Sequence, residues 1–376
     1  MNHRHPSTPK KYITLNEKPL LTYNLTFVRL ICYKKRTHQM SHNILYALRS
    51  GKPNKPLNHI ANFANLLVPK CHYRKQLQPL LSNIEHRYDY QEIVRRTNYY
   101  IKVSEPFKVS DTDELRRDRR WLYYTGRIDT FRRDMFHTSY YFDQHDITRY
   151  FAGNLRWNFC PGDVYYTPST PTVVKSRLLE GDNSNSVLLK LDKLRHFIFV
   201  NDHKTFREKQ NRVIFRGKIR DSRLRKAFLE RFFDNTRYDC GVVGRDMDEF
   251  PEEWCRPKKT IAEHLDYKFI MAIEGNDVAS NLKWVMSSNS LAVMPRPTCE
   301  TWFMEGTLKP DYHYVLVRDD YSDMEEKIQY YIDHPEAAEA IIEHAHEYVE
   351  QFRDREREKL IGLCVLDKYF RLSGQK

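Results

Sequence analysis

The chain has 376 residues and a formal net charge of +12, with 40% hydrophobic and 30% charged residues. This length exceeds one typical hydrophobic core, so we expect two domains. The mean hydropathy of −0.73 and the lack of an apolar run near the roughly 20 residues of a spanning helix argue against an integral membrane protein.

The positive charge narrows the class of partner to a nucleic acid, an anionic membrane surface or an acidic small molecule. Basic residues are interleaved with acidic ones, and no helix-turn-helix, C2H2 or RRM signature occurs. We therefore expect no nucleic acid partner and favour an anionic small molecule or lipid. The seven cysteines are scattered without a C-x-x-C pair, so we expect neither a disulfide framework nor a structural zinc site.

Residues 1–40 are polar and basic without clear periodicity, and we expect an extension that is poorly structured or dispensable. Leu20–Cys32 is the segment most like a signal sequence, but polar residues interrupt it and no small-residue cleavage site follows. We therefore expect a cytoplasmic protein. Residues 41–105 carry apolar residues at helical spacing, namely Ile60, Phe63, Leu66 and Leu67, then Leu77, Leu80, Leu81 and Ile84.

Residues 114–150 are crowded with arginine, aspartate and aromatic residues. We expect a solvated, salt-bridged surface there, with aromatic stems packed beneath it. An α/β pattern begins near residue 155, with apolar strands expected at Val187–Leu191 and Phe197–Val200. A charged connection over 201–212 is the expected domain boundary. The expected division is an N-terminal domain at 41–205, a C-terminal domain at 206–350 and a last segment at 351–376.

The strand and helix pattern restarts at Val213. A strand at Val213–Phe215 precedes a basic turn and a helix that carries Leu224, Phe228 and Phe232. A later strand is expected at Tyr314–Val317. Three helices are expected near the end of the chain, at about 322–333, 336–350 and 353–371, and the last is long enough to pack back across both domains.

The segment Asp266–Met294 is the clearest local unit. Phe269–Ile273 is an apolar run of strand length, which suits a parallel strand covered on both faces. Glu274 to Asp277 supply turn chemistry, and helical spacing follows from Leu282.

The end of this unit is equally well marked. We expect Asn289 to end the helix in the left-handed conformation that asparagine tolerates. Ser290–Met294 is a second short apolar strand. The sequence therefore predicts a β-α-β unit with a right-handed crossover.

Two strand ends in this half carry residues suited to phosphate. The turn after Phe269–Ile273 lies between the carboxyl end of a strand and the amino end of a helix, where open α/β sheets bind phosphate. Arg216, Gly217 and Lys218 follow the strand at 213–215, and an arginine offers a bidentate donor while a glycine admits close backbone approach. An ordinary basic turn would look similar. No dinucleotide or P-loop fingerprint is present.

Acidic residues suggest two further functional sites, a metal site and a catalytic base. The D-x-D pairs Asp111–Asp113 and Asp246–Asp248 could hold a divalent ion beside a diphosphate, but neither follows an apolar strand, so we expect no metal. Asp163 lies in a Pro-Gly turn, where its carboxylate could take a proton from a hydroxyl. On spacing alone, an aspartate that bonds its own turn backbone is the simpler interpretation.

Several motifs occur in order over residues 120–350. They are NFCPGDVYYTPSTPTVVKSR, FRG with the arginines that follow, YKFIMAIEGNDVASNLKWVMSSNSLAVMP, ETWFMEG, LKPDYHYVLVRDDYSDM and HPEAAEAI. Together they resemble glycosyltransferase family 90, and most closely its bacterial, lipopolysaccharide-modifying branch. Residues 1–110 carry none of this resemblance.

The resemblance implies an α/β fold of the GT-B type. In that architecture two Rossmann-like domains enclose the site in a cleft, and a C-terminal helix crosses back to the first domain. The implied reaction is an inverting transfer from a UDP-sugar that needs neither metal nor cofactor. The resemblance identifies Asp163 as the catalytic base.

The resemblance also implies a set of donor-binding residues. Arg223 is the expected diphosphate arginine, with Arg220 or Arg225 as alternatives. Eukaryotic members carry a second arginine where this chain has Asn281. Helix N–H groups, Ser280 and Lys283 are therefore expected to bind the diphosphate in its place. Glu305 is the candidate residue for binding the ribose hydroxyls. The whole expected set is Arg216, Gly217, Lys218, Arg223, Gly275, Val278, Ala279, Ser280, Asn281, Lys283 and Glu305.

The implied acceptor is an anionic, lipid-linked oligosaccharide of the lipopolysaccharide core. A basic protein suits such an acceptor, and it suits peripheral contact with the anionic inner membrane. Two alternatives remain open. One is a protein O-glycosyltransferase, although the eukaryotic relatives with that activity are secretory and disulfide-bonded. The other is a non-catalytic protein that binds nucleic acid or anionic lipid.

Overall fold

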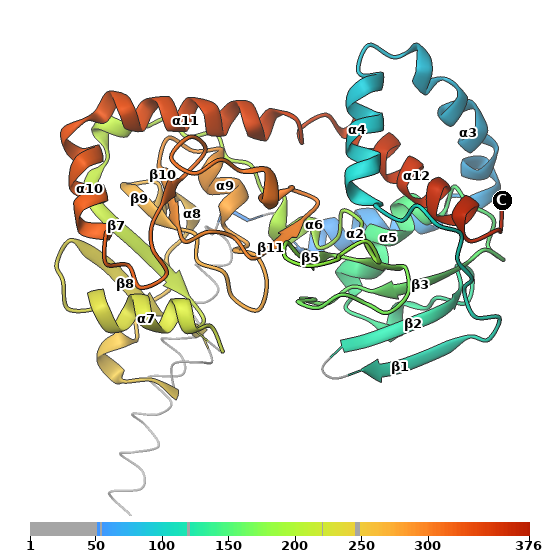
Figure 1. The fold of residues 1–376 in the computed structure, drawn as a ribbon, viewed down its shortest axis with the longest axis horizontal. Coiled ribbons are helices and arrows are strands. Elements are labelled where there is room, and N and C mark those ends of the chain that lie inside the picture. The colour runs from blue at the N-terminus through green and yellow to red at the C-terminus, as the bar shows by residue number, and fades with distance from the viewer. Residues whose placement is uncertain (1–50, 53–54, 119–120, 220, 245–248) are drawn as a thin grey trace, which may run out of the picture. The chain divides into compact units, whose positions relative to one another are not determined.

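The computed structural model describes residues 51–52, 55–118, 121–219, 221–244 and 249–376. The extension expected at 1–40, the helical pattern at 41–50, Arg220 and the Asp246–Asp248 pair lie outside these residues. The described chain is an α/β structure, as the sequence predicted, with two five-stranded sheets and helices around them (Figure 1).

The first sheet is mixed. Its strand order is β1-β2-β3-β4-β6, with antiparallel pairs among β1, β2 and β3 and parallel pairs among β3, β4 and β6. Only two residues separate β1 from β2, which allows only an antiparallel pair. An all-parallel, Rossmann-like sheet is therefore not what this half forms. The strands are β1 Glu114–Asp118, β2 Trp121–Arg127, β3 Arg156–Cys160, β4 Thr172–Val174 and β6 Ser186–Leu188.

The aromatic and charged segment is a surface strand pair over a packed interior. Arg116 and Arg117 are exposed, whereas Tyr123 and Tyr124 are buried, as the sequence predicted. The strand expected over Val187–Leu191 is shorter than predicted and ends at Leu188.

The strand expected at Phe197–Val200 is wrong. No strand forms there, and the Val200 N–H donates to the Ser287 hydroxyl at 2.9 Å. An apolar run that is buried through its side chains has the same pattern as a strand.

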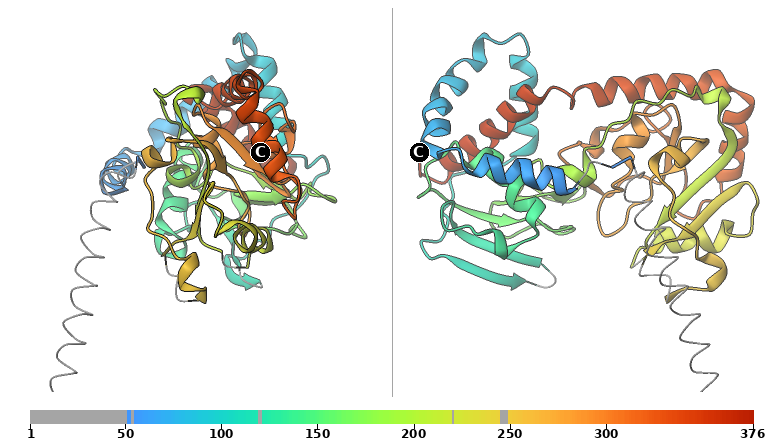
Figure 2. Two further views of the ribbon diagram at one scale, coloured as in Figure 1. Left: turned by 90° about the vertical axis from the view of Figure 1, so that its left-hand side faces the viewer. Right: turned by 180° about the vertical axis from the view of Figure 1, so that it is seen from behind.

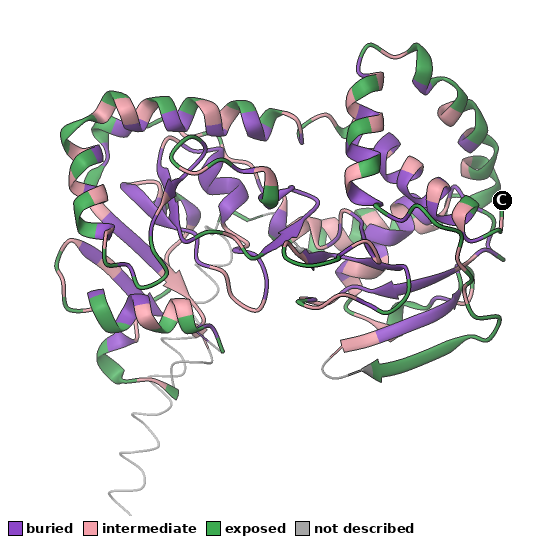
Figure 3. Cartoon of the chain, viewed as in Figure 1, coloured by how far each residue is buried: buried purple, intermediate pink, exposed green. Residues whose placement is uncertain are grey.

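The second sheet is parallel throughout, with the order β12-β10-β9-β7-β8. In chain order this is the doubly wound arrangement 2-1-3-4-5, whose ligand-binding switch point lies between its first and third strands, here β7 and β9. Figure 3 shows β9 and β10 as buried strands. The strands are β7 Gln210–Gly217, β8 Tyr238–Val242, β9 Tyr267–Met271, β10 Leu291–Met294 and β12 Val315–Leu316.

The predicted β-α-β unit is confirmed, because β9 and β10 pair in parallel with Leu291 opposite Phe269. Its helix, α9, is short and runs only over Leu282–Met286. The prediction for Asn289 is wrong, since its backbone is not left-handed. Its side-chain amide instead donates to the carbonyls of Asp202 and Lys204. This long-range anchor replaces the local cap.

The helices near the end of the chain match the prediction within two residues. The last, α12 (Arg355–Leu372), packs against α3, α4 and α5 (Figure 2). No helix of the described residues is both long enough and apolar enough to cross a bilayer. The other helices are α2 Lys55–Leu66, α3 Lys70–Ser82, α4 Tyr90–Tyr100, α5 Thr138–Thr148, α6 Lys193–His196, α7 Arg223–Phe232, α8 Ile261–His264, α10 Met324–Asp333 and α11 Pro335–Glu350.

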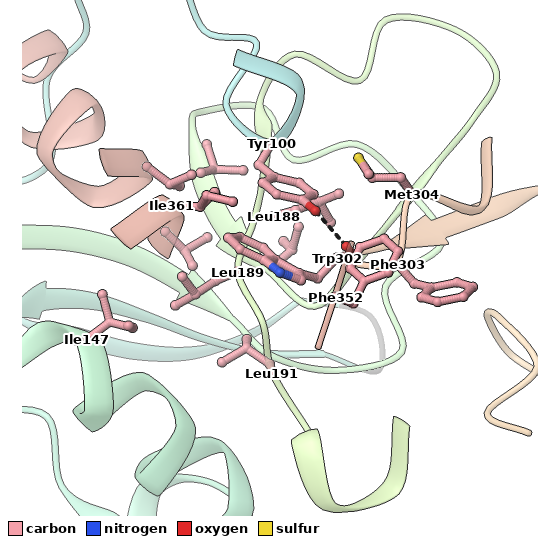
Figure 4. Close-up of a cluster of buried hydrophobic side chains, with 14 of the residues drawn as sticks. Tyr100, Ile147, Leu188, Leu189, Leu191, Trp302, Phe303, Met304, Phe352 and Ile361 are labelled. Carbon is pink, nitrogen blue, oxygen red and sulfur yellow. Dashed lines mark hydrogen bonds between the residues drawn. The ribbon is translucent and has the colours of Figure 1, made fainter. Parts of the chain in front are cut away.

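A two-stranded ladder joins the two halves. Strand β5 (Ser176–Leu178) pairs antiparallel with β11 (Cys299–Thr301). Beside it the Tyr100 ring stacks on Trp302 with centroids 3.8 Å apart, and the Tyr100 hydroxyl donates to the Trp302 carbonyl at 2.7 Å (Figure 4). Such a buried aromatic pair adds about 0.5–1.5 kcal/mol beyond its area. The ladder and this core join β5 and Tyr100 of the first half to residues 299–302 of the second.

Candidate active site

Asp163 lies just past the carboxyl end of β3, in the Pro-Gly turn. The turn passes closely under the Trp121 indole, because a β-carbon at Gly162 would lie 2.6 Å from that ring. Only glycine fits there without a shift. The Asp163 side chain is 22% exposed, so a ligand can reach it.

Lys175 brings the first cation to Asp163. It directly follows β4, the parallel neighbour of β3, and the carboxyl ends of parallel strands lie side by side. Its ammonium lies 2.5 Å from Asp163 Oδ1 and 2.8 Å from Asp277 Oδ2, and the side chain is 1% exposed. Lys175 therefore bridges two carboxylates from opposite halves of the chain.

The turn after β9 completes the cluster. The Asn276 side-chain amide donates to Asp163 Oδ2 at 3.4 Å, and Asp277 is buried beside Lys175. The structure thus brings together the candidate base and the turn predicted to bind phosphate.

A second cation reaches Asp163 from α6. Arg195 Nη2 lies 3.4 Å from Asp163 Oδ1, and Arg195 Nε lies 2.8 Å from the Asp192 carboxylate. The Arg195 side chain is about half exposed. Asp163 therefore contacts side chains of three different segments.

Electrostatics fix the charge state of the cluster. Burial alone would raise the pKa of Asp163, but the charge and hydrogen bond of Lys175, together with Arg195, hold it at about 2. Burial dominates at Asp277 and raises its pKa despite Lys175. Burial lowers the pKa of Lys175, yet Asp277, Tyr140 and Asp163 together raise it above its usual value. At neutral pH Asp163 is ionised and Lys175 is protonated.

Arg225 connects the two strand ends of the switch point. Its guanidinium donates to the Ile273 carbonyl after β9 at 2.8 and 3.1 Å, and to the Lys218 carbonyl after β7 at 2.6 Å. A β-carbon at Gly275 would lie 3.0 Å from this guanidinium, so a larger residue there would require the guanidinium to shift by a few tenths of an ångström. Arg225 is therefore a tie between the two turns.

The amino end of α7 lies against the same turn. Ser222 caps α7 and its hydroxyl donates to the Glu274 carbonyl at 2.8 Å. Arg223, the first residue of α7, is exposed, and Lys218 is half-buried. Neither side chain makes a hydrogen bond or ion pair with another described residue. These two cations stay available to a bound anion.

Arg216 is already engaged. Its guanidinium pairs with the Asp239 carboxylate and donates to the carbonyls of Asp239 at 2.6 Å and Pro257 at 3.1 Å. Gly217 closes β7, and a β-carbon there would lie 2.6 Å from the Phe215 ring. In the described part of the chain, the Arg216 side chain thus binds the edge strand β8 and the segment at Pro257. Its role toward a nucleotide stays a prediction.

Lys283 and Glu305 bond to each other. Both are buried, and Glu305 also accepts from the Thr301 N–H at 2.6 Å and the Thr301 hydroxyl at 2.9 Å. This pair explains both side chains without a ligand, and their roles toward diphosphate and ribose stay predictions. The remaining members of the expected set lie in the segment that leads into α9. Val278 and Ala279 are buried, Ser280 and Asn281 are half-buried, and the Asn281 amide donates to the Met271 carbonyl at 2.9 Å.

Asp113 is also bound within the protein. Its carboxylate lies 2.7 Å from Arg156 Nη2 and accepts from the Thr130 hydroxyl at 2.5 Å. Asp111 makes no such ion pair within the described residues. In the same part of the chain, no three histidine, cysteine or acidic side chains gather as metal ligands.

Sequence reasoning missed Lys175, Arg195, Asn276 and Asp277 as contacts of Asp163. Lys175 lay within the motif NFCPGDVYYTPSTPTVVKSR, directly after the apolar pair Val173-Val174, and that position at a strand end was the available signal. Asn276 and Asp277 belonged to the turn already predicted to bind phosphate.

Comparison with known proteins gives the family. The model for glycosyl transferase family 90 matches residues 187–371, which include the whole second sheet. An O-glucosyltransferase LpsA from Dichelobacter nodosus is 40% identical over 280 residues, which cover 74% of this chain and 83% of that protein. The chain therefore belongs to glycosyltransferase family 90.

Proposed function

We propose that the protein is an inverting, metal-independent glycosyltransferase that moves a sugar from a UDP-sugar to a hydroxyl of a lipopolysaccharide-core acceptor. The observation that carries this proposal is the contact between Asp163 and the turn after β9, which joins a candidate base to a candidate phosphate site. Family membership supports the reaction class.

The donor's diphosphate would bind at the switch point of the second sheet. Ligands of doubly wound sheets bind at this edge. Two available cations follow β7, namely Lys218 in the turn and Arg223 at the start of α7. After β9 come the turn at Gly275 and the backbone amides around Val278 to Asn281. These fixed donors would stabilise the charge that builds on the leaving diphosphate.

The reaction would be a single displacement. The acceptor oxygen attacks the anomeric carbon on the face opposite UDP, and its proton passes to the Asp163 carboxylate. The bond from the anomeric carbon to the diphosphate breaks, and UDP leaves with the electron pair. This geometry inverts the anomeric centre.

The name of the relative supports a narrower choice of sugar. Because that protein is an O-glucosyltransferase and is 40% identical, we take glucose as the transferred sugar. The net charge of +12 suits an anionic, lipid-linked acceptor and peripheral contact with an anionic membrane. In this proposal residues 41–205 face the acceptor and 206–350 bind the donor, in a GT-B arrangement, with 351–376 returning to the first.

The test is a transfer assay on the purified protein. Lipopolysaccharide core from a strain that lacks the gene is incubated with UDP-glucose, and with other UDP-sugars in parallel, and the product is weighed by mass spectrometry. The proposal expects one added hexose with UDP-glucose. Transfer to a protein serine or threonine, or salt-sensitive RNA binding without UDP affinity, would instead support one of the alternatives.

A further inference from the structure

Lys175 is shared between two carboxylates of unequal exposure. Asp163 reaches it from the turn after β3 at 2.5 Å, and Asp277 reaches it from the turn after β9 at 2.8 Å. Asp163 is 22% exposed, whereas Asp277 is 5% exposed. A ligand can therefore reach Asp163, while Asp277 contacts Lys175 behind it.

Stability alone gives little reason for this arrangement. A buried ion pair recovers little more than the desolvation of its charges, and a second buried carboxylate adds a further desolvation penalty. Clusters of perturbed, interacting charges are instead common where a protein performs chemistry. The cluster lies at the contact between the candidate base and the donor-side turn.

A base needs both a fixed position and enough basicity. A carboxylate that faces an unshared lysine is well positioned, but the adjacent charge favours its ionised form and makes it a weak proton acceptor. A second carboxylate on the same lysine offsets part of that charge. Lys175 can then hold Asp163 in place while lowering its proton affinity less than an unshared lysine would.

We propose that Asp277 is a positioning residue of the transfer reaction, which shares Lys175 with Asp163 and so keeps the base both oriented and reactive. This inference rests on the proposed function, in which Asp163 takes the acceptor's proton. It assigns roles to Lys175 and Asp277 that family membership does not provide.

The charged and titratable surroundings determine the expected pH effects. Asp277→Asn leaves Lys175 wholly to Asp163, so the pKa of Asp163 falls and its proton affinity weakens. Removing Lys175 and Asp277 together takes away the main cation, so the pKa of Asp163 rises. Besides those two residues, the groups around Asp163 and Lys175 are Arg195 and its partner Asp192, Tyr140 on α5 and His196 on α6.

The experiment compares four variants of the full chain for kcat, for KM of UDP-glucose, for the pH profile of kcat and for UDP affinity. They are Asp163→Asn, Asp277→Asn, the double variant Lys175→Met with Asp277→Asn, and Glu300→Gln. The double variant leaves no lone buried charge, so it keeps the test valid if Asp277→Asn folds poorly. Glu300 forms a comparable buried pair with Arg177 and is the matched control.

We expect Asp277→Asn to lower kcat by roughly three- to tenfold, because the proton affinity of the base is weakened, with KM and UDP affinity unchanged. The double variant should move the acid limb of kcat to higher pH than in the wild type. Glu300→Gln should leave the pH profile unchanged. A wild-type kcat in Asp277→Asn, equal loss of UDP affinity and kcat, or an unmoved acid limb in the double variant would each overturn the inference.

The same set separates this inference from the proposed function. If Asp163→Asn retains transfer, the assignment of the base itself is wrong. If Asp163→Asn is inactive while Asp277→Asn behaves as wild type, only the role of Asp277 is wrong.

Discussion

The Asn276 side-chain amide donates to Asp163 Oδ2 at 3.4 Å, across 113 residues of sequence. This contact places the candidate base beside the turn at the switch point of the parallel sheet. A displacement reaction needs its base and its leaving-group site close together, on opposite sides of one reacting carbon. The first two predictions separate these two parts of the site.

Asp163→Asn keeps the side-chain shape and removes the proton acceptor, so kcat should fall by roughly 10²- to 10⁴-fold. UDP affinity should hardly change, because the proposed diphosphate contacts lie on other segments. Steady-state kinetics and calorimetric titration with UDP measure the two quantities. Near-normal transfer by a folded variant would redirect attention to Asp143 and Asp146 on α5.

Arg223→Ala removes an exposed cation at the amino end of α7. A hydrogen bond to a charged group contributes about 1.5–3 kcal/mol, so UDP binding should weaken roughly 10- to 100-fold, and kcat/KM should fall with it. Arg231→Ala, at the opposite end of the same helix, is the matched control and should bind UDP normally. Equal UDP affinity in both variants would remove Arg223 from the diphosphate site.

Glu274 should make stability depend on pH. Burial raises the pKa of Glu274 to about 7, although hydrogen bonds from Thr298 and Cys299 oppose the shift. An unfolded glutamate titrates near pH ~4.3, so this contribution is complete below that pH and is lost as pH rises through about 7. Asp143, whose pKa burial also raises to about 7, acts in the same direction.

Thermal unfolding between pH 4 and pH 8 checks this expectation. The difference in Tm between the wild type and Glu274→Gln should fall as pH rises through this window, because Asp143 and the buried histidines, whose pKa burial lowers, contribute equally to both proteins. Asp163 contributes the opposite sign and only at lower pH, because its pKa is about 2. An unchanged slope in Glu274→Gln would show that Glu274 does not titrate there.

Transfer should survive an excess of EDTA, because fixed protein donors are proposed to neutralise the leaving diphosphate. Activity is measured before and after chelation, with Mn²⁺ added back as the control. Loss on chelation with recovery on Mn²⁺ would contradict the proposal. The pair Asp246 and Asp248 would then be the first ligands to test.

Local patterns predicted the second half of the chain well. The strand predicted over Phe269–Ile273 forms two residues earlier, as β9 over Tyr267–Met271. This strand, the parallel strand that follows and the three last helices are encoded by nearby residues, so periodicity was sufficient to predict them. The turn at Glu274 was correctly placed after a strand, whereas Arg216 and Gly217, predicted as a turn, are the last two residues of β7 and the turn begins at Lys218.

Long-range features were harder to predict. Strand β1 reads as a charged surface segment because its residues ELRRD are largely exposed at a sheet edge. Strand β4 has three residues, so the apolar pair before Lys175 was only a weak sign of a strand end, and nothing local placed that end beside Asp163. The contact of Asp163 with Asn276 depends on how two halves of the chain pack, which no local pattern encodes.

The anomeric configuration of the product tests the central claim most directly. UDP-glucose carries its sugar in the α configuration, and a single displacement with Asp163 as base inverts that centre. Proton NMR of the newly glycosylated acceptor should therefore show a β-linked glucose. An α-linked product would contradict the displacement mechanism and with it the role proposed for Asp163.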